Sequence, residues 1–277
     1  MNRIQDLEAQ NLCDCRSLFY LFMAKSALAD GSIKSEEKLR RTVRRYGELM
    51  GTAELEAHQK RGFKPNLLNF YTKSRYHCED PRLVCECQRL NEQTALFNVV
   101  RCPFAHCAAL YNMQKEAKIF CEEYTAACIE AYTGKVAQVN VSEVLTEPRN
   151  THCRIASYYR PGNIPGDCWH KYFDSFMETC QPDDAESENP DAHEALAYSS
   201  RMMLTAFVSG SVDEKTAASG IRTAGEAIAS FLKNRATCME QKVDGDFLSR
   251  NCPFDFETMR EDAQLAPFAA AFDAAMR

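Results

Sequence analysis

Residues 82–104 read RLVCECQRLNEQTALFNVVRCPF, and this stretch decides the fold class. Arg82–Leu90 and Thr94–Arg101 are two short runs of mostly strand-compatible residues, and the polar Asn91–Gln93 between them suits a hairpin loop. Pro103 follows at once and has no backbone N–H to donate, so it ends the second strand. The sequence therefore predicts an antiparallel hairpin before residue 103.

Two more strands and several helices are expected around this hairpin. Residues 136–145 and 153–159 predict a third and a fourth strand. Apolar residues at helical spacing predict helices over residues 11–28, 35–50 and 66–73, and helical structure again over 104–132. We therefore expect an α+β fold in which helices pack on one four-stranded antiparallel sheet.

The C-terminal part of the chain shows no hairpin pattern. Proline and glycine mark a break at residues 161–166, and a second loop rich in Pro, Asp, Glu and Ser is expected at residues 181–191. Helices are predicted over residues 196–209, 213–234 and 263–276. This organisation predicts an α+β domain at residues 1–165 and a helical domain at residues 166–277.

Short similarities between the two parts raise the question of a degenerate duplication. The spacings differ between the two copies, so duplication is one interpretation and chance similarity is the other. The paired segments are residues 29–33 and 208–212, each with a glycine downstream (Gly47 and Gly225), and residues 101–104 and 251–254.

Composition narrows the classes of protein that need to be considered. The 277 residues are 45% apolar, which supports a hydrophobic core, and the formal net charge of -6 argues against a nucleic-acid-binding surface. No apolar stretch approaches the roughly 20 residues that span a bilayer, and the N-terminus lacks the pattern of an export signal. We therefore expect a cytoplasmic protein without membrane contact, whose 14 cysteines are mostly reduced thiols.

Cys102 is the first candidate for a functional thiol. It precedes a proline at the end of a predicted strand, where an extended backbone can direct its side chain into a cleft beside Arg101. A neighbouring guanidinium lowers the pKa of a thiol and so favours the nucleophilic thiolate. The alternative is that Cys102 packs in the core.

Further candidates lie in the predicted helix and at the start of the fourth strand. Glu122, next to Cys121, can act as a general base, or it can belong with Glu123 to a solvated helix face. His152, next to Cys153, can exchange a proton near neutral pH, or it can be an ordinary surface residue.

A metal site is the alternative to a thiol site. Cys102, His106 and Cys107 form a run that can contribute to a zinc site, although its spacing differs from that of a zinc-finger pair. The sequence contains no glycine-rich phosphate loop, no His-Glu-x-x-His motif and no Gly-x-Ser-x-Gly motif. We expect no metal and no cofactor, with zinc as the alternative.

Several motifs follow one another in a distinctive order along residues 12–160. They are the helical run of residues 40–47, residues 80–101 leading into Arg101–Pro103, the helical Phe120–Glu123, and Leu145–Thr146 before Cys153 in the last strand. This order resembles the L-2-amino-thiazoline-4-carboxylic acid hydrolase family, whose members are proposed to open a cyclic isothiourea by water attack. The resemblance implies that Cys102, Cys121 and Cys153 occupy positions where family members carry cysteines.

The resulting hypothesis is a hydrolase that acts on carbon–nitrogen bonds other than peptide bonds. Its substrate would be a small cyclic isothiourea, an amidine-like molecule or a related compound with C–N or C–S bonds. The alternative is a non-enzymatic, thiol-rich module that binds a metal or another ligand, and a homo-oligomer is left open. The proposed catalytic residues are Cys102, Cys121, Glu122 and His152, and the proposed substrate-binding residues are Arg45, Arg101 and Cys153.

The predicted sheet also predicts where three of these residues lie relative to one another. If the four strands form one layer and residues 104–132 cross it, Cys102, Cys121 and Cys153 meet at one cleft. A separation of more than about 15 Å would exclude a shared small-molecule site.

Overall fold

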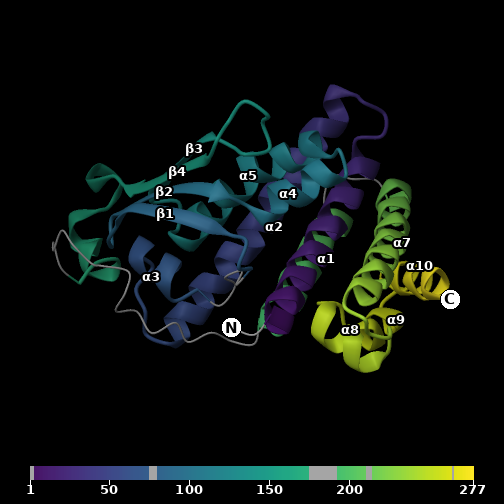
Figure 1. Ribbon diagram of the computed structural model, residues 1–277. Coiled ribbons are helices and arrows are strands. Elements are labelled where there is room, and N and C mark those ends of the chain that lie inside the picture. Colours follow the sequence, from purple (N-terminus) through teal and green to yellow (C-terminus); the bar gives the residue numbers. More distant parts are fainter. Residues whose placement is uncertain (1–2, 75–79, 175–191, 210–213, 264) are drawn as a thin grey trace.

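The protein has an α+β fold built around one antiparallel sheet (Figure 1). The computed structural model describes residues 3–74, 80–174, 192–209, 214–263 and 265–277, so the loop predicted at residues 181–191 lies outside the described residues. The strand order is β1-β2-β4-β3. The strands are β1 (Val84–Leu90), β2 (Thr94–Arg101), β3 (Ala137–Glu143) and β4 (Cys153–Tyr159). The predicted fold class and the four predicted strands are confirmed.

The hairpin between β1 and β2 is closed by an asparagine. The side-chain oxygen of Asn91 accepts hydrogen bonds from the backbone N–H groups of Gln93 (2.9 Å) and Thr94 (2.7 Å). An Asn side chain that bonds two or three residues ahead fixes a turn locally. The polar loop predicted at Asn91–Gln93 is therefore present, and its register brings Val84 opposite Arg101.

Helices precede the sheet and follow β2. The first three are α1 (Arg3–Ala27), α2 (Ile33–Lys60) and α3 (Leu67–Thr72). The side chain of Ser32 caps α2 by accepting the backbone N–H of Ser35 at 3.1 Å. The helical segment predicted over residues 104–132 forms two helices, α4 (Pro103–Leu110) and α5 (Gln114–Tyr132), with the left-handed residue Asn112 (φ 54°) between them.

The described C-terminal part is helical, as predicted. Short 3-10 turns at Pro161–Asn163 and Gly166–Lys171 follow β4. They are followed by α6 (Ala192–Ser209), α7 (Glu214–Cys238), α8 (Gly245–Asn251), α9 (Phe256–Glu261) and α10 (Ala266–Met276). Within the described residues, none of the helices combines the length and the apolar character needed to cross a membrane.

One hydrophobic cluster joins the two parts of the chain. Figure 1 shows α1 between the sheet on one side and α7 to α10 on the other, and α1 packs along α7. Phe19 of α1 is fully buried, and its ring lies 5.3 Å from that of Phe254 and 5.5 Å from that of Phe268. The core thus crosses the boundary near residue 165, and the division into two domains stays a prediction.

A buried polar cluster ties the same two parts together. Asn11 of α1 donates to the side-chain oxygen of Asn251 (2.6 Å) and accepts from Arg235 of α7 (2.6 Å). Asn11 and Asn251 are both fully buried. Hydrogen bonds of this kind are costly to break in a core, so they fix how α1, α7 and α8 fit together.

Glycines allow two helix pairs to approach closely, once in each part of the chain. A Cβ atom at Gly47 of α2 would lie 2.7 Å from the carbonyl oxygen of Tyr124 in α5, and one at Gly51 would overlap the carbonyl oxygen of Cys128. A Cβ atom at Gly225 of α7 would lie 2.7 Å from the carbonyl oxygen of Phe268 in α10. The glycines downstream of residues 29–33 and 208–212 thus both lie at close contacts between helices, and the duplication itself stays a prediction.

Candidate functional site

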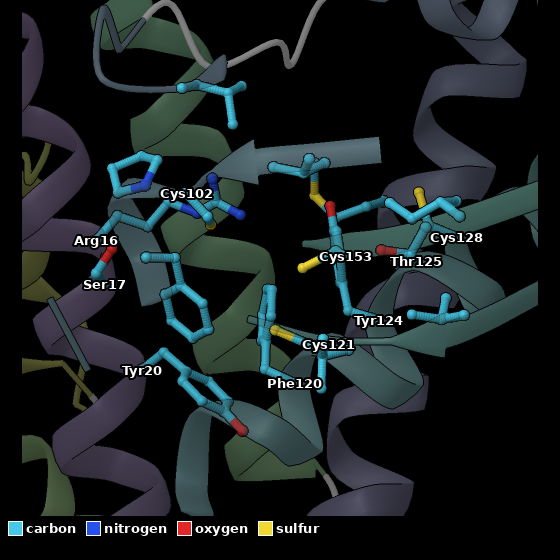
Figure 2. Close-up of a pocket in the computed structure, with 18 of the residues that line it drawn as sticks. Arg16, Ser17, Tyr20, Cys102, Phe120, Cys121, Tyr124, Thr125, Cys128 and Cys153 are labelled. Carbon is cyan, nitrogen blue, oxygen red and sulfur yellow. The ribbon is translucent and has the colours of Figure 1, made fainter. Parts of the chain in front are cut away.

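A cavity of about 380 Å³ lies between the sheet and the helices (Figure 2). The sheet contributes one face of its strands, on which Val99 pairs with Cys153 and Val141 pairs with Ile155. Its volume falls in the range of small-molecule sites, roughly 300–1,000 Å³. Helices supply the other walls, with Arg16 and Tyr20 from α1, Met50 and Glu54 from α2, Phe70 and Tyr71 from α3, Phe104 from α4, and Phe120, Cys121, Tyr124, Thr125 and Cys128 from α5.

The three cysteines singled out by the sequence all line this cavity. Cys102 is the cap residue between β2 and α4, Cys153 begins β4, and Cys121 lies on α5. Each comes from a different element, and antiparallel pairing of β2 with β4 brings the end of one strand beside the start of the other. The structure therefore places Cys102, Cys121 and Cys153 at one cavity, and Cys13 and Cys128 line it as well.

Burial keeps the thiols of this cavity in their neutral form. Burial raises the pKa of Cys121 well above its ordinary value, and the neighbouring Cys102 and Cys153 raise it further. Burial likewise raises the pKa of Cys128 to about 12 and raises that of Cys153, although the backbone N–H of Leu145, 3.2 Å from the Cys153 sulfur, opposes the second rise. These three thiols are therefore protonated near neutral pH and resemble small apolar groups more than nucleophiles.

The other residues expected in the site do not line the cavity. Cys121 faces inward, and Glu122, one step around the helix, lies toward α2 and accepts a hydrogen bond from Arg40 at 2.8 Å. His152 pairs with Glu143 at 2.9 Å, at the edge of the sheet. The catalytic roles predicted for Glu122 and His152 therefore gain no support from their positions.

The two predicted substrate-binding arginines are also outside the cavity lining. Arg45 lies on the exposed face of α2 and contacts Glu48 at 3.5 Å. Arg101 is exposed at the end of β2, and the alternation of side chains along a strand directs it away from its neighbour Cys102. Arginine does line the cavity, but at a position that the sequence analysis missed.

That arginine is Arg16, in the middle of α1. Its Nη2 donates to the hydroxyl of Tyr46 at 3.4 Å, and the same hydroxyl lies 2.5 Å from that of Ser199 on α6. In Figure 2, Arg16 and Cys102 are on one side of the cavity, and Thr125 and Cys128 are on the other. A charged residue at position 16, shortly before the apolar run of residues 18–23 in a predicted helix, is the sequence signal that could have identified it.

Glu54 of α2 is the second charged residue that the sequence analysis missed. Its side chain is 2% exposed, and it pairs with Nε2 of the fully buried His58 at 2.7 Å. The hydroxyl of Ser74 donates to Glu54 at 3.2 Å, and Nδ1 of His58 lies 2.7 Å from the hydroxyl of Tyr132. The spacing of four residues between Glu54 and His58 places both on one helix face and could have predicted the pair.

Aromatic rings form part of the cavity wall, and Tyr46 packs behind them without lining the cavity. Phe120 stacks on Tyr124 with 4.8 Å between ring centroids, and Tyr124 stacks in turn on Tyr46 at 4.8 Å. Tyr20 meets Phe120 edge-on at 4.8 Å. Rings held by one another present a rigid apolar surface, which favours a ligand with an apolar or sulfur-containing body.

The alternative zinc site gains no support from the positions of its residues. Within the part of the chain that the structure describes, no three His, Cys, Asp or Glu side chains are placed to hold a metal ion together. Cys107 is buried under α1, whereas His106 is exposed on the other face of α4.

In comparisons with protein-family models, curated proteins and solved structures, no match to this chain is found. The resemblance to the L-2-amino-thiazoline-4-carboxylic acid hydrolase family therefore stays a prediction.

Proposed function

We propose that this protein binds a compact organic carboxylate in the cavity between its sheet and helices. The observation that carries the proposal is the lining itself, which combines stacked rings and neutral thiols with the guanidinium of Arg16. Small-molecule sites share this character, being mostly apolar with a few polar groups that fix the orientation of the ligand.

The apolar wall accounts for affinity toward the body of the ligand. Burying apolar surface contributes about 25 cal/mol per Å², and thioether or thiol contacts with rings add a smaller amount. The volume of about 380 Å³ limits the ligand to the size of an amino acid or a small heterocycle. Neutral thiols can pack against the apolar body of such a ligand because they carry no charge that a partner must balance.

Arg16 is the residue proposed to bind the carboxylate group of the ligand. A guanidinium can bind both oxygens of a carboxylate at once. Burial raises the pKa of Tyr124 and of Cys128, and the positive charge of Arg16 opposes part of the rise in each. The positive charge of Arg16 therefore acts on the ring of Tyr124 and the thiol of Cys128 in the cavity wall. The same charge would stabilise a carboxylate bound in the cavity.

Matched ligands test this function. We expect the protein to bind 3-phenylpropanoate more tightly than its uncharged amide in isothermal titration calorimetry. Arg16→Met should weaken carboxylate binding at least tenfold, because a hydrogen bond to a charged group contributes about 1.5–3 kcal/mol. Arg45→Met, on the exposed face of α2, is the control and should leave binding unchanged. Equal affinity for acid and amide, or an Arg16→Met variant that binds as well as the original protein, would exclude the proposal.

A ring-opening hydrolase is the second candidate, and one observation favours it. The three cysteines implied by the family resemblance lie at one cavity together with the carboxylate of Glu54. Hydrolysis of a cyclic isothiourea needs a base for the attacking water. Glu54 lines the cavity and Glu122 does not, so Glu54 is the candidate for this base. Incubation with 2-aminothiazoline-4-carboxylate under reducing conditions should then release a ring-opened thiol, and Cys102→Ala should abolish its formation. If the compound is recovered unchanged, the hydrolase is excluded and only the proposal of ligand binding stands.

A cytoplasmic location, as predicted from the sequence, is part of this proposal. A thiol-lined cavity keeps its character only where its cysteines stay reduced, which is the condition of the cytoplasm.

A further inference from the structure

We propose that the ligand of this cavity is a zwitterion, whose ammonium group faces Glu54 while its carboxylate faces Arg16. The inference rests on the proposed function, since it names the class of ligand that the same cavity takes. It adds a second recognition site, formed by Glu54 with His58, at the opposite end of the cavity from Arg16.

The first argument is the position of Glu54 relative to the cavity. Gly51 contacts the backbone of α5 at Cys128, and Glu54 follows three residues later on the same face of α2. Cys128 lies across the cavity from Arg16 in Figure 2, and both Glu54 and Arg16 line the cavity. The two opposite charges therefore occupy separate ends of one small space.

The second argument is electrostatic. The charge of Glu54 raises the pKa of Cys128, whereas the charge of Arg16 lowers it, so both charges act on one thiol in the cavity wall. A molecule that lies along this wall experiences a negative charge at one end and a positive charge at the other. A zwitterion is complementary to both, whereas a simple carboxylate is complementary only to Arg16.

The third argument concerns the hydrogen bonds that hold Glu54 in place. Nε2 of His58 faces two acceptors, the carboxylate of Glu54 at 2.7 Å and the carbonyl oxygen of Lys73 at 3.0 Å, which favours the tautomer with the proton on Nε2. Nδ1 faces the hydroxyl of Tyr132, which can donate to it or to the carbonyl oxygen of Lys64 at 3.3 Å.

In this tautomer the Tyr132 hydroxyl donates to Nδ1 of His58, and His58 and Ser74 hold the carboxylate of Glu54 in place by hydrogen bonds. A buried carboxylate is costly unless a cation compensates it, and the ligand can supply that cation.

The experiment compares ligands that differ by one charged group. L-methionine, L-leucine and L-phenylalanine serve as probes, each measured beside its analogue without the amino group and its analogue without the carboxylate. Binding is followed by isothermal titration calorimetry at millimolar ligand. We expect at least one amino acid to bind about tenfold more tightly than both of its analogues.

Variants assign the effect to Glu54. Glu54→Gln preserves the size of the side chain and should reduce the affinity for the amino acid to that of its deamino analogue, while affinity for the deamino analogue stays the same. Glu56→Gln, at an exposed position on the same helix, is the matched control and should bind as the original protein does.

The outcomes separate this inference from the function on which it rests. If the deamino acids bind as tightly as the amino acids, the zwitterion is excluded and carboxylate binding stands. If neither class binds, the proposed function fails with it. If Glu54→Gln weakens both classes equally, Glu54 supports the structure and does not recognise the ammonium group. The ligand comparison on the unmodified protein remains decisive if Glu54→Gln does not fold.

Discussion

At the scale of single residues, the cysteines behave as neutral, space-filling side chains. Cys15 is fully buried and Cys107 nearly so, in the core around α1, while Cys121 and Cys128 belong to the wall of the cavity. Burial raises the pKa of each of these thiols. Their common property is thus a proton that the folded protein holds more tightly than the unfolded chain does.

This property makes stability depend on pH in the alkaline range. The pKa values of Cys107 and Cys128 rise from an ordinary value near 9 to about 12 in the folded state. Below about pH 9 both states keep the thiols protonated, and the stabilisation is fully present. As the pH rises from 9 toward 12 the unfolded chain loses its protons first, so the free energy of unfolding falls by about 1.4 kcal/mol per thiol and pH unit.

Urea unfolding at a series of pH values between about 8 and 10 measures this slope. The double variant Cys107→Ala, Cys128→Ala should show a shallower decrease than the original protein. Cys238→Ala, which removes an exposed thiol, should keep the original slope. A double variant with an undiminished slope would show that other groups cause the loss of stability.

At the scale of elements, the crossing of α2 and α5 positions much of the site. Glu54 lies on α2, and Cys121, Tyr124 and Cys128 lie on α5, so the packing of these two helices fixes where Glu54 lies relative to the α5 side chains of the cavity. Gly47 and Gly51 allow the close approach because they have no Cβ atom.

Gly51→Ala should therefore destabilise the protein even though alanine favours a helix. The added methyl group would overlap the carbonyl oxygen of Cys128 and push the helices apart, which costs roughly 1–3 kcal/mol, more than the ~1 kcal/mol gained in helix propensity. The melting temperature should fall. Gly245→Ala, in α8 with no atom near its would-be Cβ, should leave it unchanged or slightly higher. A Gly51→Ala variant as stable as the original protein would mean that α2 moves freely against α5.

The sequence predicted the helices and strands better than it predicted the tertiary contacts between them. Runs of strand-compatible residues with a polar loop located all four strands, because strand periodicity and turn chemistry are local properties. The break at residues 111–113 was missed, because apolar residues recur at helical spacing on both sides of it; Asn112, a residue type that tolerates the left-handed conformation at helix ends, was its local signal. Arg16 and Glu54 were missed for a different reason, since each reaches the cavity only through contacts between distant helices.

The residues that the sequence analysis proposed for a site differ in whether they line the cavity. Cys102, Cys121 and Cys153 lie at one cavity because strand pairing and the crossing helix bring them there. Glu122, His152 and Arg101 were chosen because each is next to one of these cysteines in sequence. Neighbours in a strand or helix point in different directions, so adjacency placed them outside the cavity lining.

At the scale of the whole molecule, the shared core predicts cooperative unfolding. The ring of Phe19 packs with Phe254 and Phe268, and Asn11 bonds with Asn251 and Arg235, so each part of the chain completes the core of the other. Removal of one part would expose these groups to water. We therefore expect the sheet and the C-terminal helices to unfold together.

Two spectroscopic signals measure this cooperativity. Trp169, the single tryptophan of the chain, packs on Phe173 near the sheet, with ring centroids 4.9 Å apart. Its fluorescence reports on that end of the molecule, whereas far-ultraviolet circular dichroism reports mainly on the helices. The two thermal transitions should coincide within a few degrees. Separate transitions would instead support independent domains divided near residue 165.

The two close glycine contacts also differ in what the aromatic rings beside them border. Beside the crossing at Gly225, the rings of Phe256 and Phe272 stack on each other at 4.2 Å and fill the interior. Beside the crossing at Gly47, the rings of Phe120 and Tyr124 border the cavity instead. In both places the two rings stack on each other, so the difference lies in what the stacked pair borders: the packed core beside Gly225 and the cavity beside Gly47. A substitution on the cavity side of Phe120 or Tyr124 can therefore reshape the cavity while the glycine contacts between α2 and α5 stay in place.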